Sequence, residues 1–472
     1  MTALPAPAPA PGRAAETAAG AADTDDAEDP VRDLLVAGAE RLAADDPVLH
    51  RVLAREQARQ NATLSLVASS SVVDPSVLAA QASTAVNVTA EGYPGRRYHA
   101  GCGVIDDIES LAIERARSVF GARYANVQAH SATTANYAVL SALLDPGDTL
   151  LGMNLAEGGH LTHGSPAAYA GQYFDAVGYG LDADGLIDYD QVAELAREHR
   201  PKVIICGATA YSRIVDFARF RAVADEVGAY LMADISHVAG LVATGLHPSP
   251  VDHAHITTAC THKQLFGPRG GLILVGRDHD APAPKGNGDL AAFLQRAIFP
   301  YYQGAPALNS IAAKARALAI VATPAFAATT GRIVAFSRGM AAELAGRGYP
   351  IVSGGTDNHT VLVDLRARGL SGLVAEEALE ECGIVVNKNR VPGDTTPPLV
   401  GGGVRLGSNS AAHRGMSGAE AARCAELIDT VLSAVTPLGP RTYRLPDDVR
   451  YSVSSQVAEL AAKFPLPGYA TT

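Results

Sequence analysis

The sequence predicts an α/β protein with a mostly parallel central sheet, and three observations support this fold class. First, short apolar runs are typical of buried strands; they cover 148–153, 202–207, 229–234, 255–260 and 271–276. Second, amphipathic stretches with helical spacing occur between or beside them, at 105–121, 189–199 and 216–228. Third, the chain has 472 residues, of which 47% are hydrophobic, enough for a large core. Strands that alternate with helices indicate a parallel sheet covered on both faces.

The remaining elements suggest four regions. Residues 1–30 form an Ala/Pro-rich and acidic segment that we expect to be disordered, because it has little apolar surface to bury. Residues 31–75 begin with helical spacing and are predicted to form an N-terminal helical arm. The strand and helix alternation places a large domain at 76–325. A smaller α+β domain is predicted at 326–472, where short strands at 360–365, 383–387 and 403–407 lie between helices.

Composition excludes several classes of function. The net charge of −11 argues against nucleic acid or an anionic membrane as a partner. The five cysteines are scattered and odd in number, which excludes a disulfide framework and suits a reducing compartment. We therefore expect a cytoplasmic protein, since the sequence contains neither an apolar run of about 18–20 residues nor a secretion signal.

Two polar residues at predicted strand ends point to a cofactor. Ligands of open α/β sheets bind at the carboxyl ends of the strands. Lys263 follows the strand at 255–260, and a lysine at a buried strand end loses hydration, which favours the neutral, nucleophilic amine. Asp234 ends the strand at 229–234, where its carboxylate could hold a proton on a heterocyclic nitrogen. A pyridoxal phosphate site requires both groups. Thr209, His237 and His262 lie at the same predicted edge.

The hydroxyl-rich segment 130–136 is a candidate phosphate site, because it precedes a predicted helix whose N-terminus can bind an anion. The same residues also suit ordinary capping of that helix, and both roles can hold at once, because a phosphate can occupy the cap site. Two other ligands are disfavoured. Gly101 and Gly103 lack the third glycine and the preceding strand of a dinucleotide fingerprint. The spacing of the histidines matches no standard metal site, so no metal is expected; they are His247, His253, His255 and His262.

Long strings in the chain resemble the serine hydroxymethyltransferase family over about residues 31–435. They are AEGYPGRRY (90–98), GDTLLGMNLAEGGHLTHGSP (147–166), DISHVAGL (234–241), THK with GPRGG (261–271), VSGGTDNH (352–359) and VNKN (386–389). The resemblance implies a fold-type I pyridoxal phosphate enzyme. It also implies tetrahydrofolate as the one-carbon acceptor and an obligate homodimer, with a tetramer possible, whose active sites are shared between subunits.

The resemblance assigns roles to individual residues. Lys263 would bond covalently to the cofactor, Asp234 would contact the pyridine nitrogen, and Glu91 would be the acid–base group. His160 would stack on the cofactor ring, and Arg405 would bind the substrate carboxylate. The further cofactor-binding positions implied are Ser131, Ala132, Thr133, Thr209, His237, His262, Gln303 and Gly304, the last two reaching the neighbouring subunit's phosphate. Further substrate positions are Ser69, Tyr98 and His99, and the folate positions are Glu91, Tyr98, Leu155, Gly159, Leu161 and Asn389.

Departures from the family pattern leave the substrate open. Thr89 replaces a tyrosine and is expected to open space near the substrate Cα, which suggests α-methylserine cleaved to alanine as well as serine cleaved to glycine. His99, Tyr301, Tyr302 and Thr396 also differ from the family and would reshape the acceptor side. They leave room for a folate-independent threonine aldolase or transaldolase that passes a glycyl carbanion to an aldehyde. A cofactor-binding regulator without turnover is disfavoured, because Lys263 and Glu91 are retained.

Overall fold

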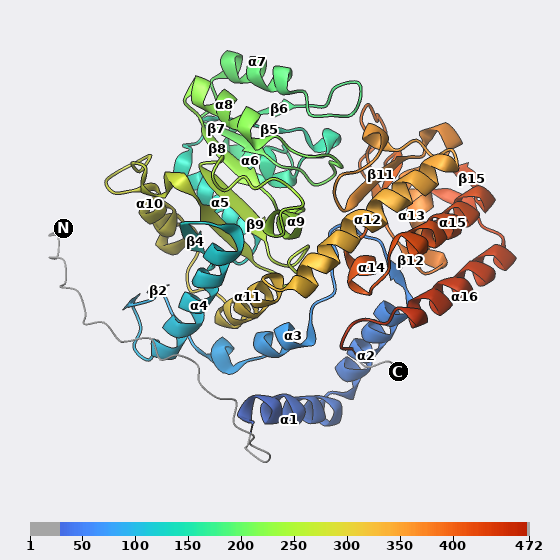
Figure 1. Ribbon diagram of the computed structural model, residues 1–472, viewed down its shortest axis with the longest axis horizontal. Helices are drawn as coiled ribbons and strands as arrows, with labels where there is room; N and C mark the ends of the chain where they lie inside the picture. The colour runs from blue at the N-terminus through green and yellow to red at the C-terminus, as the bar shows by residue number, and fades with distance from the viewer. Residues whose placement is uncertain (1–28, 470–472) are drawn as a thin grey trace. The chain divides into compact units, whose positions relative to one another are not determined.

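The computed structural model describes residues 29–469, so nearly all of the predicted tail at 1–30 lies outside the described residues (Figure 1). The chain divides by its internal contacts into residues 1–47 and residues 48–472. In the first unit, helix α1 spans Pro30–Asp45, and Asp29 caps it by accepting hydrogen bonds from the Val31 and Arg32 amides at 3.1 and 3.2 Å. A second helix, α2, spans Pro47–Ala62. Both helices fall in the segment predicted to be helical.

The second unit is built around a seven-stranded sheet. In spatial order its strands are β4 (Tyr124–Asn126), β10 (Gly271–Val275), β9 (Ile256–Cys260), β8 (Tyr230–Asp234), β7 (Val203–Cys206), β5 (Thr149–Met153) and β6 (Asp175–Tyr179). β10 runs antiparallel to both β4 and β9, and the other four pairings are parallel. The predicted mostly parallel sheet is therefore confirmed. The sequence did not reveal the edge strands β4 and β6, nor the reversal of β10.

Alternating side chains of the strands pack into two cores. In β7, Ile204 and Cys206 belong to one core, whereas Val203 and Ile205 belong to the other. This is the period-two alternation expected of a strand buried on both faces. The helices of the first core are α4 (Gly103–Phe120), α7 (Tyr189–His199), α8 (Phe217–Val227), α9 (Ala239–Ala243) and α11 (Leu308–Val321). Those of the second are α5 (Ala132–Leu143), α6 (Tyr169–Tyr173) and α10 (Leu290–Arg296).

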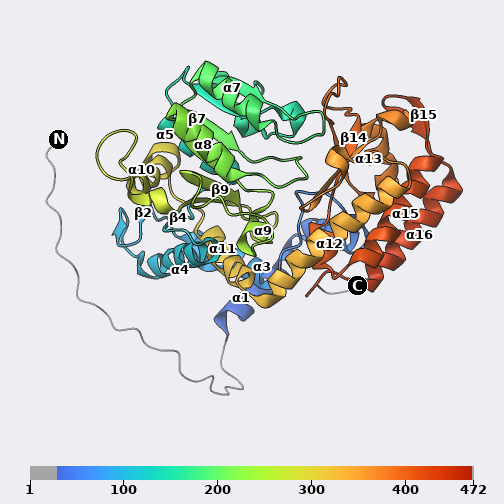
Figure 2. The same cartoon turned by 45° about the horizontal axis from the view of Figure 1, so that its top comes forward.

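A smaller sheet lies in the C-terminal part of the chain. It is antiparallel, in the order β11 (Thr360–Asp364), β14 (Gly403–Gly407) and β13 (Asn387–Asn389). Its helices are α12 (Pro324–Gly346), α13 (Gly372–Glu381), α14 (Asn409–His413), α15 (Gly418–Ala434) and α16 (Asp447–Lys463). The long helix α12 contributes residues to this core and to that of the large sheet. Figures 1 and 2 show it running from the large sheet's helices to those of the small sheet. The boundary predicted between 325 and 326 thus falls at the start of α12, and the division into two domains stays a prediction.

Short elements complete the fold. β1 (Leu64–Ser65) pairs with β12 (Ile384–Val385), β2 (Gly92–Tyr93) with β3 (Arg96–Arg97), and β15 (Thr436–Gly439) with β16 (Thr442–Arg444). Helix α3 spans Pro75–Gln81.

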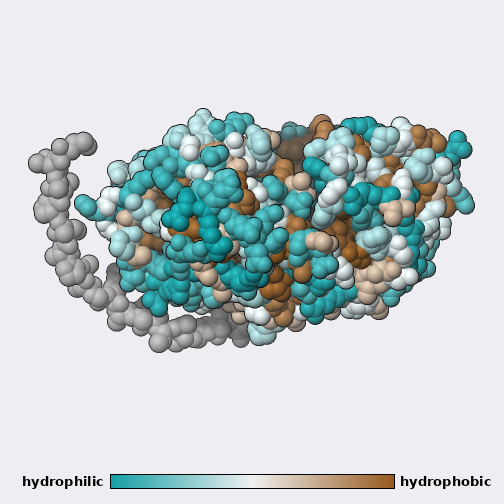
Figure 3. Space-filling model, turned by 90° about the horizontal axis from the view of Figure 1, so that it is seen from above, coloured by the Kyte–Doolittle hydropathy of each residue, from teal (hydrophilic) through white to brown (hydrophobic). Residues whose placement is uncertain are grey.

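One face of the molecule is largely hydrophilic with scattered apolar residues (Figure 3). Between residues 29 and 469, no single helix has the length and apolar character to cross a bilayer, although α11 and α12, bent by 79°, meet that criterion as a pair.

Candidate active site

A cavity of about 330 Å³ lies at the carboxyl ends of β7, β8 and β9 and at the start of α5. Ten of the residues predicted from the sequence line it: Ser69, Ser131, Ala132, Thr133, His160, Thr209, Asp234, His237, His262 and Lys263. They come from segments up to about two hundred residues apart and meet because parallel strands end at one edge of the sheet. Six further residues line the same cavity: Ser70, His163, Ala208, Ser236, Cys260 and Arg269.

Asp234, at the end of β8, is held as a carboxylate inside this cavity. Its side chain is only 7% exposed. Its Oδ2 accepts a hydrogen bond from Asn136 Nδ2 at 2.8 Å and lies 3.2 Å from His163 Nε2, while Oδ1 accepts from the Ser236 amide at 2.9 Å. Burial opposes ionisation, but the hydrogen bond and charge of His163, with the Ser236 amide, hold the pKa of Asp234 well below its usual range. The group is therefore negative at neutral pH.

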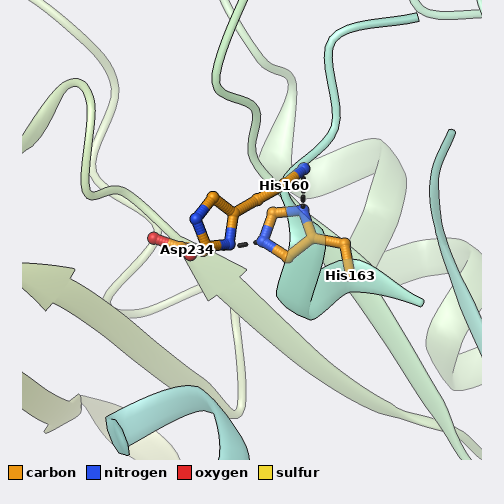
Figure 4. A group of neighbouring side chains, drawn as sticks. All are labelled: His160, His163 and Asp234. Atoms are coloured by element: carbon orange, nitrogen blue, oxygen red, sulfur yellow. Dashed lines mark hydrogen bonds and ion pairs between the residues drawn. The ribbon is translucent and has the colours of Figure 1, made fainter. Parts of the chain in front are cut away.

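His160 and His163 lie beside Asp234 on one short turn. Figure 4 shows the His163 ring directed toward the Asp234 carboxylate, with the His160 ring next to it. His160 Nδ1 lies 2.8 Å from the Thr162 hydroxyl, which fixes the orientation of the ring. Burial and the neighbouring His163 lower the pKa of His160 to about 4, so its ring is neutral and apolar in character. The ligand atoms of the three side chains lie within 4.8 Å of one another, and a hydrogen bond joins two of them, His163 and Asp234.

Lys263 lies in a tight loop between β9 and β10. The loop is closed by hydrogen bonds from the Thr261 amide to the Gly270 carbonyl at 3.0 Å and from the Thr261 hydroxyl to the Pro268 carbonyl at 2.6 Å. Ser71 donates to the His262 carbonyl at 2.6 Å, which fixes the backbone directly before the lysine. Burial lowers the pKa of Lys263, which increases the fraction of neutral amine. This is the condition for nucleophilic attack on a carbonyl.

Ser131 and its neighbours form the start of helix α5. The Ser131 hydroxyl accepts a hydrogen bond from the Thr134 amide at 3.0 Å, so it is an N-cap, as the sequence allowed. Ala132 and Thr133, in the first turn, line the cavity. An anion bound there would face the unpaired amides and the positive end of a twelve-residue helix.

Arg405 lies beside the cavity rather than in its lining. It is on β14, is 6% exposed and donates to the Thr209 carbonyl at 2.8 Å and to Asn387 Oδ1 at 3.1 Å. Burial lowers its pKa to about 10, so the guanidinium still carries its charge at neutral pH. His237 Nδ1 lies 3.3 Å from His359 Nε2. Among the described residues, the buried His237 Nε2 and His262 Nδ1 have no hydrogen-bond partner, which leaves polar groups available to a ligand.

A second group of predicted residues does not line this cavity. Thr89, Tyr98 and His99 are exposed around the β2–β3 hairpin, and Tyr98 is 76% exposed. Glu91 lies in the same hairpin region, where its amide donates to His99 Nδ1 at 3.4 Å. Gly304 adjoins it, since a Cβ at that position would lie 3.7 Å from Glu91 Oε1, and Gln303 donates to the Gln128 carbonyl at 2.8 Å.

The predicted folate residues are also separate from the cavity lining. Leu155 and Leu161, on the two turns that flank His160, are 45% and 46% exposed. Gly159 packs so tightly that a Cβ there would lie 2.1 Å from the Met153 carbonyl oxygen. Asn389, on β13, donates to the Arg390 carbonyl at 2.6 Å. The two leucines thus flank His160, which lines the cavity.

The chemical groups that line the cavity fit pyridoxal 5′-phosphate. A lysine amine, an ionised carboxylate and a helix N-terminus line one cavity, and they match the cofactor's aldehyde, ring nitrogen and phosphate respectively. Sequence reasoning missed the residues that hold Asp234 in place, Asn136 and His163. His163 could have been found from the sequence. It lies three residues after His160 in HLTH, so both side chains belong to one turn.

Half-buried histidines make the stability of the protein depend on pH. Burial lowers the pKa of His255, His262 and His413 to about 4, compared with about 6.5 in an unfolded chain. Between these values the unfolded state binds more protons, so we expect the free energy of unfolding to fall as pH falls from about 6.5 toward 4. Urea unfolding at about pH 7.5 and pH 5 measures this change in the free energy of unfolding. His255→Asn should reduce this dependence, and equal stability of the wild type at both pH values would contradict the prediction.

Comparison with known proteins agrees with this geometry. The family model described as serine hydroxymethyltransferase matches residues 42–428. A serine hydroxymethyltransferase of Synechococcus sp. (strain JA-3-3Ab) is 48% identical over 438 residues, covering 90% of this chain and 96% of the relative. One from Rhodospirillum centenum (strain ATCC 51521 / SW) is 49% identical over 428 residues, with the same coverage. The chain therefore belongs to the serine hydroxymethyltransferase family, whose members are pyridoxal-phosphate-dependent hydroxymethyltransferases with tetrahydrofolate as cosubstrate.

Proposed function

We propose that this chain transfers the hydroxymethyl group of serine or α-methylserine to tetrahydrofolate, giving glycine or alanine. The observation that carries the proposal is the single cavity in which Lys263, Asp234 and the start of α5 meet. When bound, pyridoxal phosphate supplies a covalent attachment for the amino acid and an electron sink for a bond broken at Cα. The other elements of the reaction come from the chain itself.

Each group in the cavity has a task that its environment supports. Lys263 provides the amine that holds the cofactor until the substrate amine replaces it, and its lowered pKa favours this exchange. Asp234, whose pKa is held well below its usual range, would keep a proton on the ring nitrogen. Ser131 and Thr133 would bind the phosphate at the start of α5, and the neutral His160 ring would pack on the cofactor face.

Arg405 is the proposed site for the substrate carboxylate. Its charge is buried and already oriented by the Thr209 carbonyl and Asn387. A guanidinium can bind a carboxylate through two parallel hydrogen bonds, which fixes the direction of the bonds at Cα. Thr209 and His237, which line the cavity next to it, would contact the cofactor or the substrate.

We further propose that the chain acts as a homodimer with shared sites. The hairpin residues Glu91 and Tyr98, with Gln303 and Gly304, form their own cluster and do not line the chain's cavity. Exposure of the Tyr98 ring leaves it available to a neighbouring subunit. In such a dimer Glu91 moves the proton of the reaction in the partner's site, and the exposed Thr89 leaves room for a second substituent at the substrate Cα.

Mixing two inactive variants tests the sharing of sites. A dimer of one Glu91→Gln subunit and one Lys263→Ala subunit retains one complete site if Glu91 serves the neighbouring cavity. Random mixing then restores about a quarter of the wild-type activity, because half of the dimers are mixed and each has one working site. Activity no greater than the sum of the two variants would show that each chain uses its own Glu91.

The folate-independent aldolase or transaldolase remains the second candidate. It is favoured by Thr396, His99 and the two tyrosines 301 and 302, which differ from the family pattern. The discriminating experiment is cleavage of serine, α-methylserine and threonine, each with and without tetrahydrofolate. Folate-dependent cleavage of serine or α-methylserine supports the main proposal. Cleavage of threonine that is indifferent to folate, with transfer to an added aldehyde, would replace it.

A further inference from the structure

Lys314 is a fully enclosed lysine whose partners are all backbone carbonyls. It lies on α11 and is 2% exposed. Its Nζ donates hydrogen bonds to the carbonyls of Val127, Ala129 and Gly271 at 2.5, 2.9 and 3.1 Å. No acidic side chain in residues 29–469 forms an ion pair with it. The charge of the buried Glu109 acts on Lys314 from beyond ion-pair distance. A buried ammonium without a direct ion-pair partner is costly, so the position calls for an explanation beyond packing.

The three carbonyls lie directly behind the proposed phosphate loop. Val127 and Ala129 belong to the segment that leads from β4 to Ser131, and the Gly271 amide donates to the Ala129 carbonyl at 2.9 Å. Gly271 is so close to that loop that a Cβ there would lie 2.3 Å from the Ser131 carbonyl oxygen. Lys314 therefore joins the segment before Ser131 to the start of β10.

A second side chain also holds this segment. The carbonyl of Gln128, between the two residues that Lys314 binds, accepts a hydrogen bond from Gln303 Nε2 at 2.8 Å. Lys314 and Gln303 therefore hold three successive carbonyls, those of Val127 and Ala129 and that of Gln128. The backbone that precedes Ser131 thus has little freedom to rotate.

We infer that Lys314 is a positioning residue for the cofactor phosphate. It fixes the backbone of the Ser131 loop and places a positive charge behind the start of α5, where the phosphate binds. This inference rests on the assignment of that loop in the proposed function. Burial lowers the pKa of Lys314 to about 7, and a bound dianion nearby would favour its charged form.

The test compares cofactor binding with and without the phosphate. Full-length Lys314→Met, freed of cofactor, is titrated with pyridoxal 5′-phosphate and with pyridoxal, and the dissociation constants are measured from the absorbance of the lysine-bound chromophore. We expect the preference for the phosphorylated form to fall by about tenfold or more, with pyridoxal binding little changed. Loss of folding stability alone would weaken both ligands equally.

Arg414→Met is the matched control. Arg414 is 7% exposed and also donates to backbone carbonyls, among them Thr63, Asn61 and Ala461 at 2.8, 2.9 and 2.8 Å, but it does not line the cavity. Its replacement should lower the melting temperature and leave the ratio of the two dissociation constants unchanged.

A second variant tests the inference while keeping the lysine. Gly270→Ala places a Cβ 2.1 Å from the Lys314 Cε, so the ammonium must move away from its carbonyls. This variant should also reduce the preference for pyridoxal 5′-phosphate over pyridoxal. Wild-type preference that persists in both variants would overturn the role of Lys314. If wild-type protein itself binds both forms equally, the phosphate assignment of the Ser131 loop is wrong instead.

Discussion

Lys263→Ala is expected to reduce the turnover of serine by at least about a thousandfold, because no other amine in the cavity can bond to the cofactor. The variant should also lose the visible absorbance of the lysine-bound chromophore. Asp234 and the start of α5 are unchanged, so the cofactor should still bind through its phosphate and ring nitrogen. Absorbance spectra, equilibrium binding and initial rates measure these effects together.

Lys202→Ala is the matched control for this variant. Lys202 is 55% exposed and pairs with Asp148 at 2.7 Å on the surface, an interaction of little energetic value. Its replacement should leave both the spectrum and the rate unchanged. If Lys263→Ala keeps the chromophore and cleaves serine at the wild-type rate, the cavity described above is not the active site.

The sequence was most informative where burial alone decides structure. The runs at 202–207 and 229–234 became β7 and β8, because strands buried on both faces are apolar throughout. The edge strand β6 was missed, since its exposed and half-buried residues lack that continuity. The reversal of β10 was also not predictable, because an apolar run of five residues carries no information about its direction.

The candidate site shows the same division. Lys263 and Asp234 could be chosen from the sequence because a charged residue at the end of an apolar strand is unusual and faces the ligand edge. The residues that hold the site in place could not be chosen from the sequence. Asn136 lies 98 positions before Asp234, and Lys314 lies 187 after Val127, so only the folded chain brings these atoms together. Polar residues inside helices such as α5 and α11 look like ordinary helix surface until the packing is known.

Asp234→Asn is expected to lower kcat by about a hundredfold or more while changing the KM for serine little. An amide of the same size cannot keep a proton on the ring nitrogen, so the electron sink that breaks the bond at Cα is weakened. The fold should tolerate the change. The amide oxygen can still accept from the Ser236 amide, and His163 Nε2, as the other tautomer, can accept from the new NH₂ group. The hydrogen bond from Asn136 Nδ2 is lost, because the new NH₂ group then faces another NH₂ donor.

Asp216→Asn separates this effect from a general loss of negative charge. Asp216 is exposed and caps α8 by accepting from the Arg219 amide at 3.0 Å, a position where asparagine is equally effective. The kcat and the melting temperature of the Asp216→Asn variant should match those of the wild type. A wild-type kcat in Asp234→Asn would mean that the negative charge of Asp234 is not used in the reaction. The Asp234 carboxylate would then serve only to hold Asn136 and His163 in place. The hydrogen bonds that stabilise its charge, and so lower its pKa, are the same ones that fix the cavity wall.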